Sequence, residues 1–259
     1  MPELPDLQVF SHNLDKQLSG KKVTQVQLKN AKKAKQSAAA FKKALEGNKL
    51  KEVYREGKEL RFRFKDDVIL GMHLMLHGKL FYYEAENPNK HTILELLFDD
   101  NSGLALTDYQ GMAVASLNPE ETGVPDALSD EMTADFLKET LAKKKTIIKK
   151  LLLDQHIIRG IGNAYADEIL WVAGISPFSV SNKIPAAKVK ALHKAIHKVL
   201  KDAEKNIRKA HPDIIAGEVR DFLKIHSPKQ TLSPTGATIE QQALNGRKTY
   251  YTAEQELFE

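Results

Sequence analysis

Apolar side chains at the start of the chain follow the spacing of an amphipathic helix. They fall three or four residues apart, on one face of a helix over residues 5–19: Leu7, Phe10, Leu14 and Leu18. Gly20 comes next, where a glycine commonly follows the end of a helix. The chain is therefore expected to open with a helix.

Alternation of apolar and polar residues replaces this spacing further along the first half. Residues 60–64 and 68–74 alternate on either side of a turn with two aspartates, which predicts a hairpin. A second pair of strands is predicted at residues 92–98 and 104–107, joined by a turn that contains Asn and Gly. The first half is therefore expected to be mostly β structure after its opening helix.

Helical spacing returns beyond about Pro125. The clearest example is an apolar series with intervals of three, four and eight residues: Val189, Leu192, Ile196, Val199 and Ile207. The end of the chain is turn-rich again, and Asn245-Gly246 precedes a β-prone run at residues 248–252. The second half is expected to be a helical domain with a small terminal hairpin.

Composition adds a charge and several exclusions. The 259 residues hold 39 Lys and Arg against 34 Asp and Glu, a net charge of +5, which favours an anionic partner. No cysteine is present, which excludes disulfides, thiol catalysis and cysteine-bearing zinc sites. No apolar run reaches the roughly 18 residues of a membrane span, and no signal peptide opens the chain, so we expect a soluble intracellular protein.

The segment at residues 154–168 joins two apolar helical patterns through a loop with two glycines. Gly160 and Gly162 allow close approach of the backbone, and Asn163 is expected to cap the next helix while its amides face an anion. This pattern predicts a phosphate clamp. An ordinary helix–helix turn is the alternative for a short Gly-x-Gly taken alone.

The full segment resembles the helix–two-turn–helix of the formamidopyrimidine-DNA glycosylase and endonuclease VIII family. The matching residues are Leu-Leu-Asp-Gln, Gly-Ile-Gly-Asn and Tyr-Ala-Asp-Glu, followed by Ala173-Gly174-Ile175. The resemblance implies an α+β fold: an N-terminal helix plus β-sandwich at residues 1–125, a helical DNA-binding domain at 126–225 and a finger hairpin at 226–259.

The N-terminal Pro2-Glu3-Leu4-Pro5 is similar to the opening of the same family. The resemblance implies that removal of Met1 exposes the amine of Pro2 as a covalent nucleophile, with Glu3 as the proton-transfer partner. An α-amino group titrates near ~8 and lysine near ~10.4, so more of the N-terminal amine is neutral at pH 7. An ordinary helix start is the alternative for proline followed by an early acid.

Three residues of the β half match family positions. Lys58 matches a lysine beside the catalytic proline that contacts a phosphate near the lesion, and His73 matches a phosphate-contacting histidine. Leu76 falls where an apolar side chain enters the gap left by the flipped base. Each residue also has a purely structural alternative. Lys58 could be ordinary surface charge, His73 a histidine at a strand end and Leu76 a core residue.

The C-terminal Asn245–Tyr251 run resembles the tip of the family's zinc-finger hairpin, and Arg247 matches its phosphate-binding arginine. The four cysteine positions of that finger hold residues that form no zinc set: Leu232, Thr235, Thr252 and Gln255. We therefore expect a zincless finger with no metal. Packing of Leu244, Tyr250 and Leu257 is expected to hold the hairpin.

Two departures from the family concern the lesion. Gly111 stands where formamidopyrimidine-type members have an arginine that probes the opposite base, and Met112 replaces an aromatic wedge but can still fill the void. Few residues separate Arg220–Leu223 from the finger, which leaves no room for the loop that covers 8-oxoguanine. That base is disfavoured, while oxidised pyrimidines, ring-opened purines, bulky alkyl adducts and cross-links stay open.

The resemblance thus implies a bifunctional DNA glycosylase and AP lyase of base excision repair. Its expected partner is damaged double-stranded DNA, bound in a basic cleft between the domains, with no cofactor, metal or membrane. We expect a monomer in the cytoplasm, associated with the nucleoid if the source is prokaryotic. A non-catalytic protein that binds distorted DNA, and a basic structural or RNA-binding protein, are the alternatives.

Overall fold

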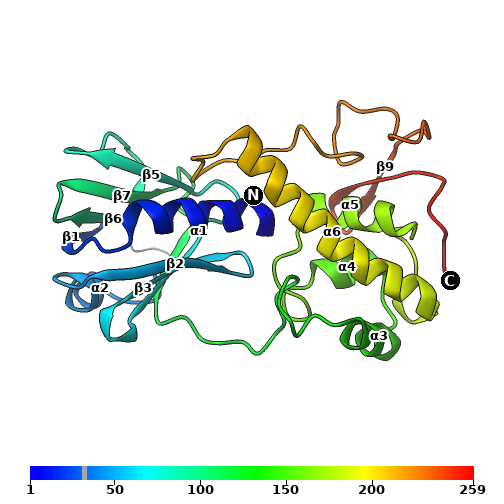
Figure 1. Cartoon of the computed structure of the whole chain (residues 1–259), viewed down its shortest axis with the longest axis horizontal. Coiled ribbons are helices and arrows are strands. Elements are labelled where there is room, and N and C mark those ends of the chain that lie inside the picture. Colours follow the sequence, from blue (N-terminus) through cyan, green and yellow to red (C-terminus); the bar gives the residue numbers. More distant parts are fainter. Residues whose placement is uncertain (31–33) are drawn as a thin grey trace. The chain divides into compact units, whose positions relative to one another are not determined.

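The computed structural model describes residues 1–30 and 34–259 and contains two compact units (Figure 1). Unit 1 comprises Met1–Thr122 with Ile207–Glu218, and unit 2 comprises Gly123–Asn206 with Val219–Glu259. The division into three domains drawn from the sequence stays a prediction.

Unit 1 contains helices and two antiparallel sheets. Its elements are α1 (Leu4–Leu18), β1 (Val23–Leu28), α2 (Ala38–Leu45), β2 (Leu50–Glu56), β3 (Glu59–Phe64), β4 (Ile69–His73), β5 (Lys79–Glu84), β6 (Thr92–Phe98), β7 (Ser102–Thr107) and β8 (Val114–Leu117). One sheet has the strand order β1-β6-β7-β5 and the other β2-β3-β4-β8. The predicted hairpins are the pairs β3–β4 and β6–β7, and both are confirmed.

The core of unit 1 lies between α1 and the two sheets. The predicted apolar face of α1 is at most 1% exposed: Leu7, Phe10, Leu14 and Leu18. It shares one cluster with Phe62 and Leu70 of the second sheet and with Leu94 of the first. Burial of each of these side chains contributes roughly 1.5–3 kcal/mol. It also sets the register of the strands, because a slip by one residue would turn Phe62, Leu70 and Leu94 to solvent.

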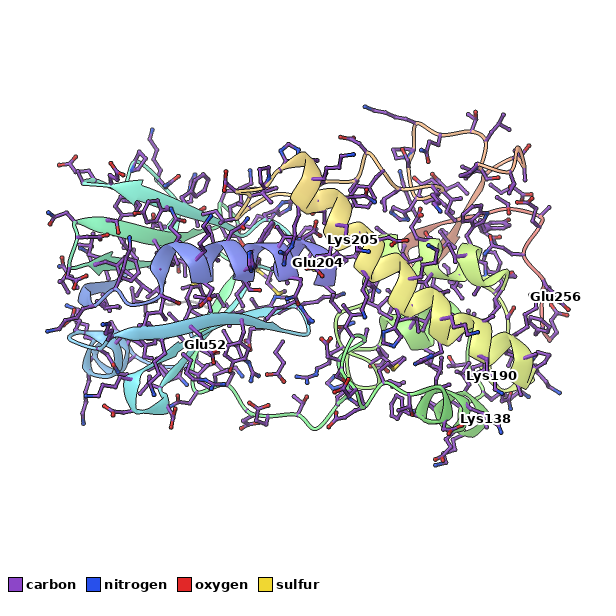
Figure 2. All side chains as sticks on the ribbon, viewed as in Figure 1. Glu52, Lys138, Lys190, Glu204, Lys205 and Glu256 are labelled. Atoms are coloured by element: carbon purple, nitrogen blue, oxygen red, sulfur yellow. The ribbon has the colours of Figure 1, made fainter. Side chains whose placement is uncertain are left out.

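Unit 2 is helical with one hairpin. Its elements are α3 (Ala134–Lys143), α4 (Ile148–Leu153), α5 (Asn163–Ala173), α6 (Ala186–Ala210), whose last turn is grouped with unit 1, β9 (Glu240–Leu244) and β10 (Arg247–Tyr251). Helix α6 buries Leu192 and Ile196 completely, while Lys190 and Lys205 are exposed on its surface (Figure 2). The predicted hairpin is confirmed, with Asn245-Gly246 as its turn. No helix in the described residues is long and apolar enough to cross a membrane.

Hydrogen bonds occupy three of the four positions that correspond to zinc ligands. Thr235 Oγ1 and Thr252 Oγ1 donate to the Glu254 carboxylate at 2.8 and 3.3 Å. Gln255 Oε1 accepts the Thr252 N–H at 2.8 Å, and Gln255 Nε2 donates to the Ile175 carbonyl at 2.8 Å. These bonds tie the segment after β10 to the segment before β9 and to Ile175, which follows α5.

Packing of the hairpin differs from the sequence prediction at one residue. Tyr250 is 6% exposed and Leu244 is half-buried, but Leu257 is 49% exposed. The prediction for Leu257 is wrong because the last residues of the chain run along the surface, where the main chain of Phe258 pairs with Val180. Polar contacts supply the rest of the attachment.

Candidate active site

The N-terminal residues are held by the first turn of α1. Glu3 is the N-cap: its backbone N–H donates to Asp6 Oδ2 at 2.8 Å, and its carboxylate accepts the Asp6 backbone N–H. This reciprocal pair satisfies two donors that a helix start leaves without intrahelical partners. Pro2 is buried, and Glu3 is 4% exposed. The position of Pro2 is therefore set by the helix start.

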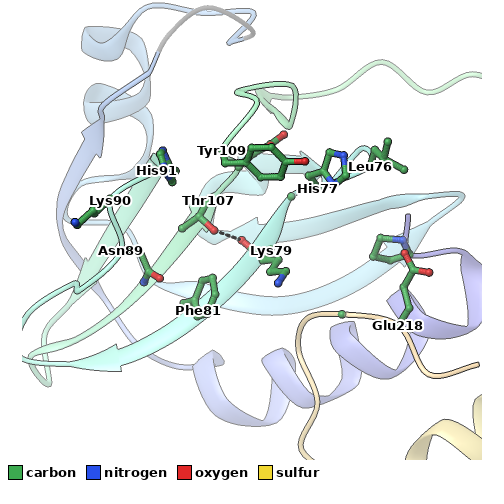
Figure 3. A pocket seen from close by; sticks show the side chains of 14 residues that line it. Leu76, His77, Lys79, Phe81, Asn89, Lys90, His91, Thr107, Tyr109 and Glu218 are labelled. Atoms are coloured by element: carbon green, nitrogen blue, oxygen red, sulfur yellow. Dashed lines mark hydrogen bonds between the residues drawn. The ribbon is translucent and has the colours of Figure 1, made fainter.

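A pocket of about 360 Å³ lies beside Pro2 in unit 1. Its lining comes from the β4–β5 connection, β5, the segment before β6, the end of β7 and the segment after α6. Figure 3 shows Glu218 at one end of this pocket, and Lys90 and His91 at the other. The volume falls in the range of about 300–1,000 Å³ typical of small-molecule sites.

Glu218 is a pocket residue that the sequence reasoning missed. Its Oε1 forms an ion pair with the α-amino group of Met1, and Gly217 and Glu218 both line the pocket. Met1 and Glu218 are 217 residues apart, so no local spacing could have placed them together. The only signal was a carboxylate close to the Arg220 motif.

Lys58 and His73 are brought together at one edge of the second sheet. Lys58 lies in the turn between β2 and β3, and His73 is the last residue of β4. Burial and the nearby charge of Lys58 lower the pKa of His73 below 6.5. The Met75 N–H donates to His73 Nδ1 at 3.1 Å, so the neutral ring carries its proton on Nε2. His73 is therefore set up as a neutral hydrogen-bond donor.

The two predicted void-filling residues are exposed apolar side chains. Leu76 is 59% exposed and lines the pocket, and Met112 is 39% exposed but does not line it. Large apolar side chains in contact with solvent suit insertion into another surface.

The loops that carry these side chains are held by close packing and by hydrogen bonds. A Cβ at Gly78 would lie 2.2 Å from the Leu74 carbonyl oxygen, so the turn around Leu76 requires glycine there. On the other loop, Asp108 accepts backbone N–H groups of Gln110, Met112 and Ala113 at 2.8 to 2.9 Å. Leu76 and Met112 are thus presented from fixed backbone.

The glycine loop of unit 2 is braced by one side chain. Gln155 Oε1 accepts the Gly160 N–H at 2.9 Å, and Gln155 Nε2 donates to the Ile161 carbonyl at 2.9 Å. Gly160 has φ +103°, a conformation that other residues avoid. The loop leads directly into α5.

Asn163 does not cap α5, which corrects the sequence prediction. Gly162 is the N-cap and Asn163 is the first helical residue. Its side chain instead faces β10, where Nδ2 donates to the Lys248 carbonyl at 2.9 Å. Asn163 therefore joins the glycine loop to β10.

Arg247 opens β10 beside the same loop region. It lines a pocket of about 320 Å³ with residues of α4 and of the hairpin turn, including Lys150 and Asn245. Gly160, Gly162, Asn163 and Arg247 thus all belong to unit 2, whereas Pro2, Glu3, Lys58, His73, Leu76 and Met112 all belong to unit 1. The described residues hold no group of three or more His, Cys, Asp and Glu arranged for a metal ion.

Comparison with known proteins gives consistent matches over most of the chain. Residues 1–114 match the profile of the formamidopyrimidine-DNA glycosylase N-terminal domain, and residues 124–211 match that of its H2TH domain. A formamidopyrimidine-DNA glycosylase of Lactobacillus gasseri is 31% identical over 97% of each chain. These matches confirm the resemblance stated from the sequence.

Solved structures of similar proteins agree with these family matches. A Lactococcus lactis Fpg in complex with abasic-site DNA has a TM-score of 0.87 at 25% identity, and covers 97% of this chain and 98% of its own. A complex of the Lactococcus lactis Fpg with DNA containing an oxidised pyrimidine has a TM-score of 0.87 at 26% identity, with the same coverage. The predicted α+β fold class is confirmed.

Proposed function

This chain belongs to the formamidopyrimidine-DNA glycosylase family, and we propose that it excises a damaged base from duplex DNA and cleaves the strand through the amine of Pro2. It is a DNA glycosylase and AP lyase of base excision repair. The observation that carries the role of Pro2 is its position: the capping box at Glu3 fixes it beside the 360 Å³ pocket.

The chemistry starts from the chain without Met1. The neutral amine of Pro2 attacks C1′ of the damaged nucleotide, and the C1′–base bond breaks with its electron pair going to the base. The C1′–O4′ bond of the sugar ring then opens, O4′ takes a proton, and the nitrogen lone pair forms the C=N bond of an iminium Schiff base. Glu3 is the proposed proton-transfer partner, since its backbone is adjacent to the amine. Elimination of the 3′ phosphate then cleaves the strand.

Phosphate contacts are proposed on both units. In unit 1, the proposed contacts are the charge of Lys58 and the neutral donor His73. In unit 2, they are the charge of Arg247 and the loop of Gly160, Gly162 and Asn163. Cationic contacts release condensed counterions, so affinity for duplex DNA should fall steeply with salt. A flat salt response would contradict this interface.

The damaged base is proposed to lie outside the 8-oxoguanine class. Only residues 224–239 separate the Arg220–Leu223 motif from β9. An oxidised pyrimidine is the first lesion to test, because the Lactococcus lactis relative was solved with one. We further propose that the protein acts as a monomer in the cytoplasm, and at the nucleoid if its source is prokaryotic, as the sources of the bacterial relatives suggest.

Borohydride trapping on an abasic-site duplex tests the amine chemistry. The Met1-free chain should give a covalent band whose mass maps to the N-terminal peptide, because borohydride reduces a Schiff base between the protein and the DNA to a stable amine. Pro2→Gly keeps a free amine with altered geometry and should trap slowly. Glu3→Gln should slow base excision by about 10²–10⁴-fold, the usual contribution of general acid–base catalysis.

A negative result would favour the non-catalytic alternative. If the wild-type chain binds the duplex in a salt-sensitive manner but gives no band, the amine is not a nucleophile. The protein would then be a sensor of distorted DNA with the same fold.

A further inference from the structure

The pocket beside Pro2 contains a carboxylate that the chemistry above does not use. Glu218 lines this pocket (Figure 3). It forms an ion pair with the α-amino group of Met1, and its side chain is 36% exposed. Glu3, by contrast, is 4% exposed and accepts the Asp6 N–H at the start of α1. Glu218 is thus the more accessible of the two carboxylates.

The segment that carries Glu218 is anchored to unit 1. Asn13 Nδ2 donates to the Ile214 carbonyl at 2.9 Å, and Ile214 and Ile215 pack against the hydrophobic core. Gly217 has φ +94°, a conformation that favours glycine, and it turns the chain immediately before Glu218. The position of the carboxylate is therefore set by the backbone.

Met1 marks positions that the substrate occupies after Met1 is removed. The carbonyl carbon of Met1 is bonded to the nitrogen of Pro2, and in the Schiff base C1′ of the lesion takes that bond. The Cα of Met1 then stands in for C2′, and its amino nitrogen stands in for an atom bonded to C2′. Because Glu218 Oε1 contacts that amino group, the carboxylate reaches a substituent of C2′.

We propose that Glu218 is the base that removes the C2′ proton in the elimination step, an inference that rests on the proposed function. The proton passes to the carboxylate, the C2′–H electron pair forms the C1′=C2′ bond, and the iminium nitrogen takes the C=N pair. The nitrogen lone pair of the enamine then re-forms the C=N bond, the C1′=C2′ pair forms C2′=C3′, and the C3′–O bond breaks, so that the 3′ phosphate leaves with the C3′–O pair. The proton on Glu218 is released to water.

Other titratable groups of the pocket are placed differently. They are His77, Lys79, Lys90, His91, Asp108 and Tyr109. The Asp108 carboxylate accepts three N–H groups of its own loop, and the His77 ring packs against Tyr109 at 4.8 Å between centroids. Lysine ammonium groups have no lone pair to accept a proton. Glu218 is the carboxylate that contacts the N-terminus itself.

Single-turnover kinetics on an abasic-site duplex separate this step from Schiff-base formation. We compare the Met1-free wild type with Glu218→Gln, Glu218→Asp and a control, Glu86→Gln, which changes an exposed glutamate of the same unit. Borohydride trapping reports the Schiff base, and strand cleavage reports elimination. Glu218→Gln should trap at the wild-type rate but cleave about 100-fold more slowly.

The remaining variants and a labelled substrate test whether the effect is specific to the Glu218 carboxylate. Glu218→Asp, which keeps a carboxylate with shorter reach, should restore part of the cleavage rate, and Glu86→Gln should cleave as wild type. An abasic site deuterated at C2′ should slow cleavage by Glu218→Gln, because proton removal then limits the rate.

Two results would overturn the proposal. Wild-type cleavage by Glu218→Gln would mean that another base takes the proton. A parallel loss of trapping and cleavage in a folded Glu218→Gln chain would mean that Glu218 acts on the amine instead. If the wild type itself fails to trap, the proposed function fails, which is a different outcome from either.

Discussion

The ammonium nitrogen of Lys149 lies 2.6 Å from Asp167 Oδ1, and the two side chains are 1% and 0% exposed. The other carboxylate oxygen accepts the Tyr250 N–H at 3.0 Å and lies 2.7 Å from His226 Nδ1. Lys149 Nζ also donates to Thr249 Oγ1 at 2.9 Å. This buried pair joins α4 and α5 to β10, so it anchors the hairpin in a finger that has no cysteine.

Asp167→Asn should destabilise the chain by about 3–5 kcal/mol, because it leaves the Lys149 charge buried without its counterion. Urea denaturation measures this free energy of unfolding. The matched control is the double variant Lys149→Met/Asp167→Leu, which removes both charges and should lose much less. A loss below about 1 kcal/mol in Asp167→Asn would show that the pair does not anchor the hairpin.

Chelators should leave the thermal midpoint and DNA binding unchanged. Three of the four positions that correspond to zinc ligands, Thr235, Thr252 and Gln255, make hydrogen bonds to one another or to Glu254, and no chelator removes these bonds. Thermal denaturation with and without EDTA checks this. A drop of several degrees with EDTA, reversed by added zinc, would refute a metal-free finger.

His73 should make the protein less stable as the pH falls. Its pKa is below 6.5 in the folded chain, because burial and Lys58 disfavour the charged ring. As the pH falls through 6.5, the unfolded chain gains a proton that the folded chain does not, so the free energy of unfolding decreases until the folded pKa is reached. His73→Gln removes this contribution.

Urea denaturation of wild type and His73→Gln between pH 5 and 8 tests the sign. Plotted against pH, the free energies of unfolding of the two proteins should run parallel well above pH 6.5. Below that pH, the wild type should lose more stability than His73→Gln. Parallel curves over the whole range would contradict a lowered pKa.

Leu76→Ala and Met112→Ala should slow base excision more than strand cleavage. Both side chains are exposed and proposed to fill the space that a flipped base leaves, and an abasic site has no base to hold out. We expect about tenfold slower excision from a paired lesion, which corresponds to ~1.4 kcal/mol in the barrier. Cleavage at an abasic site should change by less than about twofold.

Gel assays under single-turnover conditions separate these rates. Leu232→Ala is the matched control, since Leu232 is 58% exposed but lies in unit 2. Equal slowing at both substrates would assign Leu76 and Met112 to general DNA binding.

The sequence by itself determined the elements whose signal is local. The spacing of Leu7, Phe10 and Leu14 predicted α1, and alternation predicted the hairpins, because burial of one face requires those periods. The segment at residues 154–168 identified the family, which the comparisons confirmed. The candidate residues Pro2, Glu3, Lys58, His73, Leu76, Met112 and Arg247 came from the same resemblance.

Only the tertiary structure decided which distant residues meet. Glu218 contacts Met1, and Lys149 pairs with Asp167 under β10, although no local period links either pair. Asn163 donates to the Lys248 carbonyl instead of capping α5, because the fold places β10 beside the first helical residue. Contacts of this kind depend on how separate elements pack, and a linear pattern of apolar and polar residues carries no information about that.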